Sequence, residues 1–515
     1  MRSNVGIRLR RNASALALLA GLVAAAGVAR AADTRPVVET DLGAVKGVAA
    51  DGVAVFKGIP FAAPPTGELR WRPTQAARRW KGERDAAEFG PNCPQPSRSG
   101  GEAGPQSEDC LTLNVVTPDP KGKLPVLVSI HGGAFFVGSG RYLIDRGIPE
   151  IVRRGVVLVS PNYRIGRLGF FAHPAMAGGG EAVGNYWLMD QIAALEWVKR
   201  NIARFGGDPG NVTILGCSAG GSSVNSLVAS PAARGLFARA SVHSGGGFFN
   251  ATRPLATAEQ QGREFAARAG APGDGADALA KLRTLTPAEI IAADPGPPNF
   301  GAIIDGRLLR DQVSVSFAKG DTADVPVISG STSNEASVFG LMGFDRKVLA
   351  ARFGVDVDAL RPAYEADGPL DEAELLRQVQ TDFIFTSAAT GMAALADKAG
   401  RPAYAYHFDH VGAAQRGKVP GAAHCEDMRY TFATAPLADA QDQRVARMMQ
   451  DYFLNYVRAG DPNGPGLPAW PRYGAQAPAP LVIGAETRAV PGFRARQLAP
   501  WYAKWSADTG QAFPR

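Results

Sequence analysis

The chain has 515 residues, of which 45% are hydrophobic and 20% charged, and its formal net charge is +7. Five arginines and no other charged residue fall within residues 1–31, so the remainder carries a charge near 7 minus 5, or +2. This near-neutral balance, with no basic run that interleaves aromatic residues, leaves no argument for nucleic-acid binding. No stretch after Ala32 approaches the roughly 20 consecutive apolar residues of a membrane span, which argues against a span in the mature chain.

The first 31 residues have the pattern of an export signal. Four arginines precede the apolar run 13–28, and Ala29 and Ala31 place small residues where a signal peptidase cuts. We therefore expect a signal peptide over residues 1–31 and a periplasmic or extracellular mature chain, with an uncleaved anchor as the alternative. The pair Arg10-Arg11 also permits twin-arginine export.

A Gly-rich loop follows the first long apolar run. Residues 124–130 predict a buried strand, and His131-Gly132-Gly133-Ala134-Phe135 comes directly after it. In hydrolases with a nucleophile elbow, the loop after an early strand supplies backbone N–H donors to the developing oxyanion. We expect the amides of Gly132, Gly133 and Ala219 to do this, each contributing about 2.7 to 4 kcal/mol to the transition state. A plain glycine-rich turn is the alternative.

Apolar strands then alternate with a helical pattern. Residues 156–159 and 212–215 predict strands, and apolar residues recur at helical spacing through 189–205. Such alternation predicts an α/β fold with a large, mainly parallel central sheet between helices. Two Ala-rich, charged stretches, 251–298 and 344–398, we interpret as helical excursions over the mouth of an active site.

The motif Gly216-Cys217-Ser218-Ala219-Gly220 comes directly after the run that ends at Leu215. It matches the G-x-S-x-G nucleophile elbow, in which a sharp strand-to-helix turn exposes a serine in a strained backbone conformation. Glycines flank the serine because the turn leaves no room for larger side chains. Hydrolysis through Ser218 is therefore the first hypothesis.

A serine hydroxyl needs a base, and the base needs a carboxylate that orients it. Residues 325–328 predict a strand, and Glu335 lies just beyond its carboxyl end, where catalytic groups of open α/β sheets gather. We assign the acid to Glu335. Asp305 and Asp409 are rivals, although Asp305 precedes a glycine in a pair typical of turns.

The base is expected among six histidines. Elbow hydrolases order the triad Ser, acid, His along the chain, which removes the histidines before residue 335. His407 and His410 belong to an aromatic-rich strand pattern over 403–410, where a histidine usually has a structural role. His424 lies in a loop of small residues from which an imidazole can reach the serine, so we assign the base to His424.

By these motifs the chain resembles the type B carboxylesterases, the lineage of cholinesterases and bacterial para-nitrobenzyl esterases. The resemblance covers nearly the whole mature chain. Segments that match the family's signatures occur in their usual order at residues 56–62, 69–71, 108–115, 162–164, 184–185, 190–191 and 205–220.

The resemblance implies an α/β-hydrolase fold in a single domain over residues 32–515. It implies a serine esterase that acts on a small-molecule ester with neither cofactor nor metal. A non-catalytic binding protein on this fold, and an acyltransferase or amidase with the same triad, are the alternatives; retention of the serine argues against the first. The site residues that it implies are the triad Ser218, Glu335 and His424 and the oxyanion hole at Gly132, Gly133 and Ala219.

Two of the four cysteines flank the expected triad, since Cys217 precedes Ser218 and Cys425 follows His424. Serine and base must approach hydrogen-bond distance, so their neighbours can lie within the Cα separation of about 4.4 to 6.8 Å that a disulfide needs. We predict a Cys217–Cys425 bond, with two buried thiols as the alternative. The same Cys-Ser and His-Cys pairs resemble those of tannases and fungal feruloyl esterases, which favours aromatic or polyphenolic esters as substrates.

The other two cysteines, Cys93 and Cys110, lie in a loop whose counterpart in the family is usually bridged, so the resemblance implies a second disulfide. Both bonds require an oxidising compartment, in agreement with the export signal. Aromatic residues near the motifs are candidates for a substrate pocket, although core packing is equally expected for each: Phe135, Phe136, Phe248, Phe249, Phe339, Tyr186 and Trp187.

Overall fold

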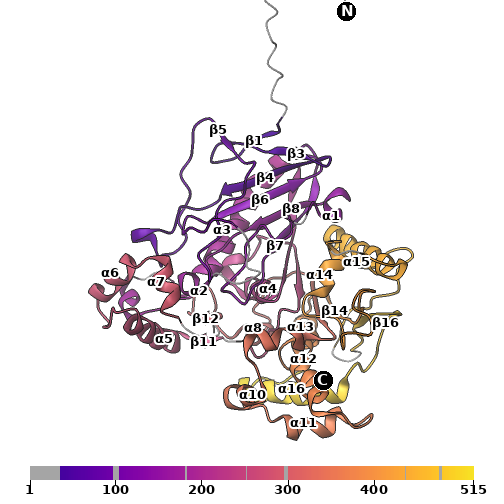
Figure 1. Ribbon diagram of the computed structural model, residues 1–515. Helices are drawn as coiled ribbons and strands as arrows, with labels where there is room; N and C mark the ends of the chain where they lie inside the picture. Colours follow the sequence, from indigo (N-terminus) through magenta and orange to yellow (C-terminus); the bar gives the residue numbers. More distant parts are fainter. Residues whose placement is uncertain are drawn as a thin grey trace, which may run out of the picture. The chain divides into compact units, whose positions relative to one another are not determined.

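The structure is a computed structural model that describes residues 35–96, 104–145, 147–179, 182–250, 252–294, 300–434, 437–474 and 478–514. The expected signal segment 1–31 lies outside the described residues and stays a prediction, as does the single-domain extent 32–515. Residues Pro36–Arg515 form one compact unit, held together by its internal contacts. At its centre the described strands make an 11-stranded sheet (Figure 1).

The central sheet is mainly parallel, which confirms the α/β prediction. All strands from β15 to β8 in the spatial order run parallel, and antiparallel strands complete both edges. In that order the strands are β16 (Thr487–Ala489), β15 (Leu481–Ile483), β14 (Ala403–Phe408), β13 (Val327–Thr332), β10 (Arg239–His243), β9 (Gly207–Cys217), β7 (Leu124–Ile130), β8 (Val157–Pro161), β6 (Thr112–Thr117), β4 (Val53–Pro60) and β3 (Val48–Ala50). Two small sheets pair β1 (Val37–Glu39), β2 (Ala44–Lys46) and β5 (Glu83–Asp85), and β11 (Arg253–Pro254) with β12 (Ile303–Ile304).

Helices lie in many of the connections between the strands. Both stretches expected to be helical excursions contain helices, α5 to α7 in the first and α10 to α13 in the second. The described helices are α1 (Glu150–Arg153), α2 (Gly166–Gly169), α3 (Tyr186–Asn201), α4 (Ala219–Ala229), α5 (Leu255–Arg268), α6 (Ala276–Thr284), α7 (Pro287–Ala292), α8 (Val313–Ala318), α9 (Phe339–Met342), α10 (Arg346–Phe353), α11 (Val357–Tyr364), α12 (Glu372–Thr381), α13 (Ser387–Lys398), α14 (Glu426–Thr431), α15 (Ala440–Ala459) and α16 (Ala495–Thr509).

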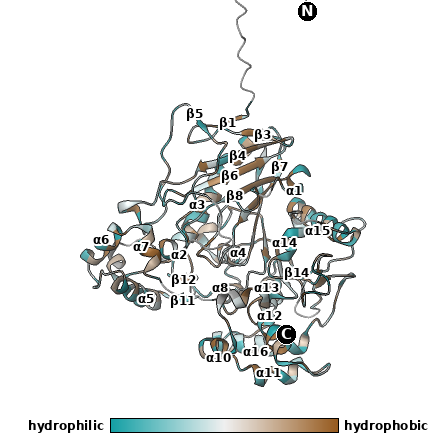
Figure 2. Cartoon of the chain, in the orientation of Figure 1, coloured by the Kyte–Doolittle hydropathy of each residue, from teal (hydrophilic) through white to brown (hydrophobic). Residues whose placement is uncertain are grey.

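The central strands are apolar throughout because both faces of the sheet are covered. Along β7, Val126, Val128 and Ile130 belong to a hydrophobic cluster that includes residues of α3, α4, α8 and α13. Leu127 belongs instead to a cluster with residues of α14 and α15. Successive side chains of a strand point to opposite faces, so a strand covered on both sides reads as a continuous apolar run. Figure 2 shows the hydrophobic character of β4, β6, β7 and β8.

The candidate site residues gather because they follow the carboxyl ends of neighbouring parallel strands. In the sheet order β13, β10, β9, β7, these ends are Thr332, His243, Cys217 and Ile130. Carboxyl ends of parallel strands open at one edge of the sheet, so the loops after them face a common space. None of the described helices combines the length and the apolar character that crossing a membrane requires.

Candidate active site

The nucleophile elbow is formed by the end of β9 and the start of α4. Ser218 stands between Cys217 and Ala219 with φ 59° and ψ −126°. A positive φ is uncommon outside glycine and persists only where the surroundings hold it. Here the Ser218 amide donates to the His243 carbonyl at 3.0 Å, and the Ser218 carbonyl accepts from the Ser222 amide at 2.9 Å.

Glycines beside Ser218 allow backbone segments to approach closely. A Cβ on Gly216 would lie 2.3 Å from the carbonyl carbon of Gly220, and one on Gly220 would lie 2.2 Å from the carbonyl oxygen of Ile130. A Cβ on Gly221 would lie 2.6 Å from the Cα of Gly245. These distances are too short for real carbon contacts, so a larger residue at any of these positions would push the elbow apart.

The loop after β7 turns beside the elbow through consecutive residues with positive φ. Gly133, Ala134 and the residue after them have φ values of 106°, 50° and 63°. A Cβ on Gly132 would lie 3.3 Å from the Cβ of Ser218. Among the described residues, the amides of Gly132, Gly133, Ala134 and Ala219 donate no hydrogen bond. Free amides beside a nucleophile can stabilise an oxyanion, so Ala134 joins the three expected donors as a fourth candidate.

His131 supports this loop. Its Nδ1 lies 2.9 Å from the Gly132 carbonyl oxygen, and the Tyr163 hydroxyl donates to the His131 carbonyl at 2.8 Å. The two rings stack with centroids 4.2 Å apart. Burial lowers the pKa of His131 to about 4, so the ring is neutral near pH 7 and holds the loop through its Nδ1–H.

His424 and Glu335 form a hydrogen-bonded pair. Nδ1 of His424 lies 2.5 Å from Oε2 of Glu335, whose side chain is fully buried. The other carboxylate oxygen accepts from the Ser244 hydroxyl at 2.6 Å and from the Thr332 amide at 2.7 Å. These hydrogen bonds offset the cost of burying the carboxyl group. It holds the imidazole with Nδ1 as donor, which leaves Nε2 as the acceptor.

The loop that carries His424 is fastened to the segment that follows β13. The Asn334 amide donates to the Ala422 carbonyl at 2.8 Å, and the Ala422 amide donates to Ser333 Oγ at 2.9 Å. The His424 amide donates to Ser337 Oγ at 2.9 Å. Glu335 and His424 therefore lie on two segments whose backbones are hydrogen-bonded to each other.

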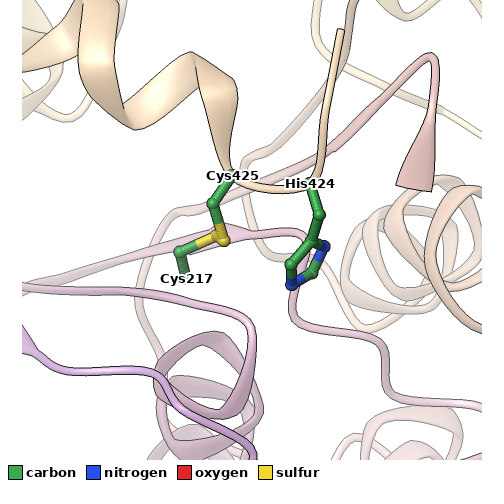
Figure 3. Close-up of side chains that lie close together, drawn as sticks. All are labelled: Cys217, His424 and Cys425. Carbon is green, nitrogen blue, oxygen red and sulfur yellow. A yellow bond between two sulfur atoms is a disulfide. The ribbon is translucent and has the colours of Figure 1, made fainter. Parts of the chain in front are cut away.

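A disulfide joins the same loop to the elbow. Cys217 and Cys425 are bonded, with their Cα atoms 6.1 Å apart. Their sulfur atoms and a ring nitrogen of His424 lie within 4.8 Å of one another. Figure 3 shows the disulfide beside the imidazole. The imidazole is thus beside the chain segment that carries Ser218. Its Nε2 is buried and has no hydrogen-bond partner among the described residues, and catalytic hydrogen bonds often close only when substrate binds.

This group of two sulfurs and one imidazole has the spacing of a metal site but not its chemistry. A cysteine binds a metal ion through its thiolate. Here the two sulfurs are bonded to each other in a disulfide, so neither is a thiolate. The second disulfide joins Cys93 to Cys110, with Cα atoms 5.0 Å apart. The described residues contain no free cysteine.

A buried polar cluster ties α14, which follows His424, to the sheet. Nδ1 of His243 lies 2.6 Å from Oδ2 of Asp427, and the Tyr406 hydroxyl donates to that oxygen at 2.5 Å. Burial opposes ionisation of Asp427, but attraction to His243 and hydrogen bonds from both partners hold its pKa below the usual value. Burial and then the Asp427 charge raise the pKa of Tyr406 well above its usual value, so its hydroxyl stays a donor.

The rival residues have structural contacts. His407 lies in β14 with Nδ1 3.0 Å from Ser331 Oγ, and burial, followed by the Arg494 charge, lowers its pKa to about 3. His410 pairs with Asp442 at 2.9 Å. The other two rivals are carboxylates. Asp305 accepts hydrogen bonds from three successive backbone amides of its own turn, and Asp409 is exposed.

Comparison with known proteins identifies the family. A model of the carboxylesterase family matches residues 34–501. The chain belongs to this family. It is 35% identical over 499 residues to the fumonisin B1 esterase of Sphingopyxis macrogoltabida, with 91% of this chain and 90% of that protein covered. It is 33% identical over 484 residues to the para-nitrobenzyl esterase of Bacillus subtilis (strain 168), with 88% and 96% covered.

Solved structures confirm the fold of this carboxylesterase. A carboxylesterase of Geobacillus stearothermophilus superposes with a TM-score of 0.80 at 33% identity, covering 91% of this chain and 100% of the other. A para-nitrobenzyl esterase superposes with a TM-score of 0.78 at 29% identity, covering 91% and 100%. The α/β-hydrolase fold and the type B carboxylesterase resemblance are therefore confirmed, and the protein is a carboxylic ester hydrolase whose substrates are small-molecule esters.

Some residues of the site were not recognised from the sequence. Ser244, which donates to Glu335, directly follows His243 at the end of β10 and precedes a run of glycines, a signal of a tight strand-end turn. Phe385 packs on His424 with ring centroids 4.8 Å apart, yet it lies in a π-helical turn of the second excursion. Nothing in the local sequence indicates that contact.

The two disulfides allow a matched test. In the chain-entropy model, closing 208 residues stabilises the fold by about 5 kcal/mol and closing 17 residues by about 3 kcal/mol. The pair of changes Cys217→Ala and Cys425→Ala should lower Tm and also lower kcat about a hundredfold, because the imidazole loses its tie to the elbow. Cys93→Ala with Cys110→Ala should lower Tm but change kcat by less than about threefold. Steady-state kinetics and thermal melts of both variants check this, and equal kcat losses would contradict it.

Proposed function

We propose that this carboxylesterase works through an acyl-enzyme on Ser218, with His424 as the base and Glu335 as the carboxylate that orients it. The observation that supports the proposal most directly is the 2.5 Å contact between His424 Nδ1 and Glu335 Oε2. His424 lies on a loop that the Cys217–Cys425 disulfide joins covalently to the elbow. A serine in a strained turn, a base and a buried carboxylate are the parts that acyl transfer through serine requires.

In the proposed mechanism, Ser218 Oγ attacks the ester carbonyl while Nε2 of His424 accepts the hydroxyl proton. Negative charge on the carbonyl oxygen is stabilised by backbone amides of Gly132, Gly133 and Ala219. His424 then returns the proton to the leaving alcohol, and an acyl-enzyme remains. Water, deprotonated by the same imidazole, then attacks the acyl group. His424 returns that proton to Ser218 Oγ as the acyl C–O bond breaks, and the carboxylic acid leaves.

The acyl group is proposed to be aromatic or polyphenolic. Aromatic residues Phe135 and Trp187, on the loop after β7 and on α3, have ring centroids 5.1 Å apart near the elbow. The named relatives act on different compounds, as the names fumonisin B1 esterase and phenmedipham hydrolase indicate. An apolar pocket discriminates between acyl groups by about 1 to 3 kcal/mol, which is enough for a measurable preference.

Two other activities would use the same serine, histidine and carboxylate. A binding protein would use the fold without these catalytic residues. Amide hydrolysis and acyl transfer to another alcohol need the same serine, base and oxyanion donors. A binding protein on this fold would not need the strain at Ser218, and its positive φ of 59° favours catalysis.

Export from the cytoplasm is proposed from the first 31 residues and the disulfides. Both pairs of cysteines in the described chain are bonded, and disulfides persist in oxidising compartments. The sequence pattern of residues 1–31 supplies the route.

The catalytic assignment is tested by three single substitutions. Ser218→Ala should reduce kcat for 4-nitrophenyl acetate by about a million-fold with an unchanged Tm, because the nucleophile is lost. Glu335→Gln should reduce kcat by about 10⁴-fold, because a neutral amide no longer stabilises the imidazolium. Asp409→Asn, at an exposed carboxylate, should leave kcat within about twofold. Wild-type turnover by Ser218→Ala would refute the proposal.

The acyl preference is tested with the methyl esters of different acids, so that the alcohol is the same and only the acyl group changes. We expect kcat/KM for galloyl and feruloyl esters to exceed that for the butyryl ester by about tenfold, since the pocket rewards an aromatic ring. The corresponding amides and added acyl acceptors should give slower turnover than the esters in water. A higher efficiency for the butyryl ester would remove the aromatic preference without affecting the triad.

The export proposal is tested on protein made from the full chain in a bacterium with a periplasm. Mass spectrometry of the periplasmic fraction should give a chain that begins at Ala32, and thiol titration of the denatured, unreduced protein should give no free thiol. A cytoplasmic chain that retains residues 1–31 would contradict export.

A further inference from the structure

Three atoms of types that bind metal ions gather where the His424 loop meets the elbow. The sulfur atoms of Cys217 and Cys425 and a ring nitrogen of His424 lie within 4.8 Å of one another. Figure 3 shows that the imidazole lies on one side of the two sulfurs. While the disulfide is intact, neither sulfur is available to a metal ion. The reduced form of the chain has a different chemistry at this place.

The Cys217–Cys425 bond is the more exposed of the two disulfides. Cys217 is 8% exposed and Cys425 is partly exposed, whereas Cys93 and Cys110 are 2% and 0% exposed. A thiolate must reach a sulfur atom to break a disulfide by exchange, so a dithiol should reduce the more exposed bond first. The dithiol gives up two electrons and two protons, becomes a disulfide and leaves two cysteine thiols. A newly made chain also holds these thiols until an oxidant joins them.

The two thiols and the imidazole have the spacing of a zinc site. Zinc binds thiolate sulfur at about 2.3 Å and histidine nitrogen at about 2.0 Å in a tetrahedral arrangement, which places its ligand atoms about 3.5 to 3.8 Å apart. The sulfurs, bonded at about 2.0 Å in a disulfide, must therefore separate by about 1.7 Å. Rotation about the two Cα–Cβ bonds can supply this movement, because the Cα atoms are 6.1 Å apart. Water can take the fourth position.

The imidazole is already oriented as a zinc ligand. His424 Nδ1 lies 2.5 Å from Glu335 Oε2, and His424 Nε2 is buried without a hydrogen-bond partner among the described residues. Histidines that bind zinc nearly always donate their other ring N–H to a carboxylate, a carbonyl or water, which fixes the tautomer and makes the free nitrogen more basic. Glu335 is held in turn by the Ser244 hydroxyl at 2.6 Å and the Thr332 amide at 2.7 Å. The ligand and the group that orients it are therefore both in place.

We propose that the reduced chain binds one Zn²⁺ through Cys217, Cys425 and Nε2 of His424. Zinc displaces one proton from each thiol and accepts the Nε2 lone pair of the neutral imidazole, so two protons are released for each ion bound. Zinc binding and disulfide formation then compete for the same two sulfurs. Inhibition by zinc rests on the proposed function, because a lone pair held by zinc cannot accept the Ser218 proton.

The binding test uses the chain with Cys93→Ala and Cys110→Ala, reduced with a phosphine and then freed of it, so that neither another cysteine nor an added thiol competes. Titration with Co²⁺ should give a thiolate-to-cobalt absorption band that saturates at one ion per chain, and Zn²⁺ should displace the cobalt. The oxidised chain should show no such band. His424→Ala should weaken zinc binding about a hundredfold and Glu335→Gln about tenfold, because losing a ligand costs more affinity than losing the group that orients it.

The matched control is the chain with Cys217→Ala and Cys425→Ala, treated in the same way. After reduction it also has two thiols, those of Cys93 and Cys110, whose Cα atoms are 5.0 Å apart. Within the described ranges, neither of these cysteines belongs to a group of three potential metal ligands. The control should bind zinc about a hundredfold more weakly than the test chain, because it lacks the imidazole ligand. Equal affinities in the two chains would overturn the inference.

Hydrolysis of 4-nitrophenyl acetate separates this inference from the proposed function. Zinc should lower the turnover of the reduced test chain about a hundredfold relative to the same reduced chain without zinc, because the general base is blocked. A chelator should restore that turnover, and the oxidised chain should be unaffected by the same zinc concentration. Cobalt binding with unchanged turnover would leave the metal site standing and refute His424 as the base.

Absence of the cobalt band would overturn the metal site and leave the proposed function intact. Should the reduced chain unfold, circular dichroism decides. An ion that binds only the folded state stabilises it, so an excess of zinc of about tenfold should restore the native spectrum of the reduced test chain. A chain that stays unfolded in zinc would overturn the inference.

Discussion

The strained backbone of Ser218 persists because three backbone segments meet around it without side chains between them. Gly216 and Gly220 close the turn on itself and against the end of β7, and Gly221 meets Gly245 after β10. The close contacts that exclude a Cβ also prevent the turn from relaxing. Ser218, the loop after β7 and the Ser244 segment are therefore positioned by one packing constraint.

The imidazole comes from a part of the chain that this packing does not reach, and it is positioned by different means. Backbone hydrogen bonds join its loop to the segment after β13, a disulfide joins it to the elbow, and the Asp427 cluster joins the following helix to β10 and β14. Together these three kinds of contact limit the motion of His424, and the role proposed for it requires placement to within about 0.5 Å.

Periodicity and strand-end motifs were sufficient to predict the elements that carry the site. The run 124–130 coincides with β7 because that strand is covered on both faces. β9 starts earlier than expected, at Gly207, because its first residues include the turn-forming Asp208-Pro209-Gly210, which conceal a strand. β13 continues to Thr332 through polar residues that the sheet buries, among them Ser331, whose hydroxyl meets His407.

Contacts between distant segments could not be predicted in this way. A cavity beside α4 is lined by Trp187, Asn225 and Phe300, which no local sequence pattern connects. The contact of Phe385 with His424 arises because Phe385 lies in a π-helical turn. His243 was set aside on chain order, yet its side chain braces Asp427. Such roles follow from tertiary packing, which sequence periodicity does not encode.

The bond between Cys217 and Cys425 joins positions separated by 208 in the sequence, an interval that includes β10, β13 and Glu335. A single protease cut in a surface loop inside this interval therefore releases no free fragment, because the disulfide keeps the two pieces covalently attached. The helical insertions within the interval can thus be nicked without separating Ser218 from His424.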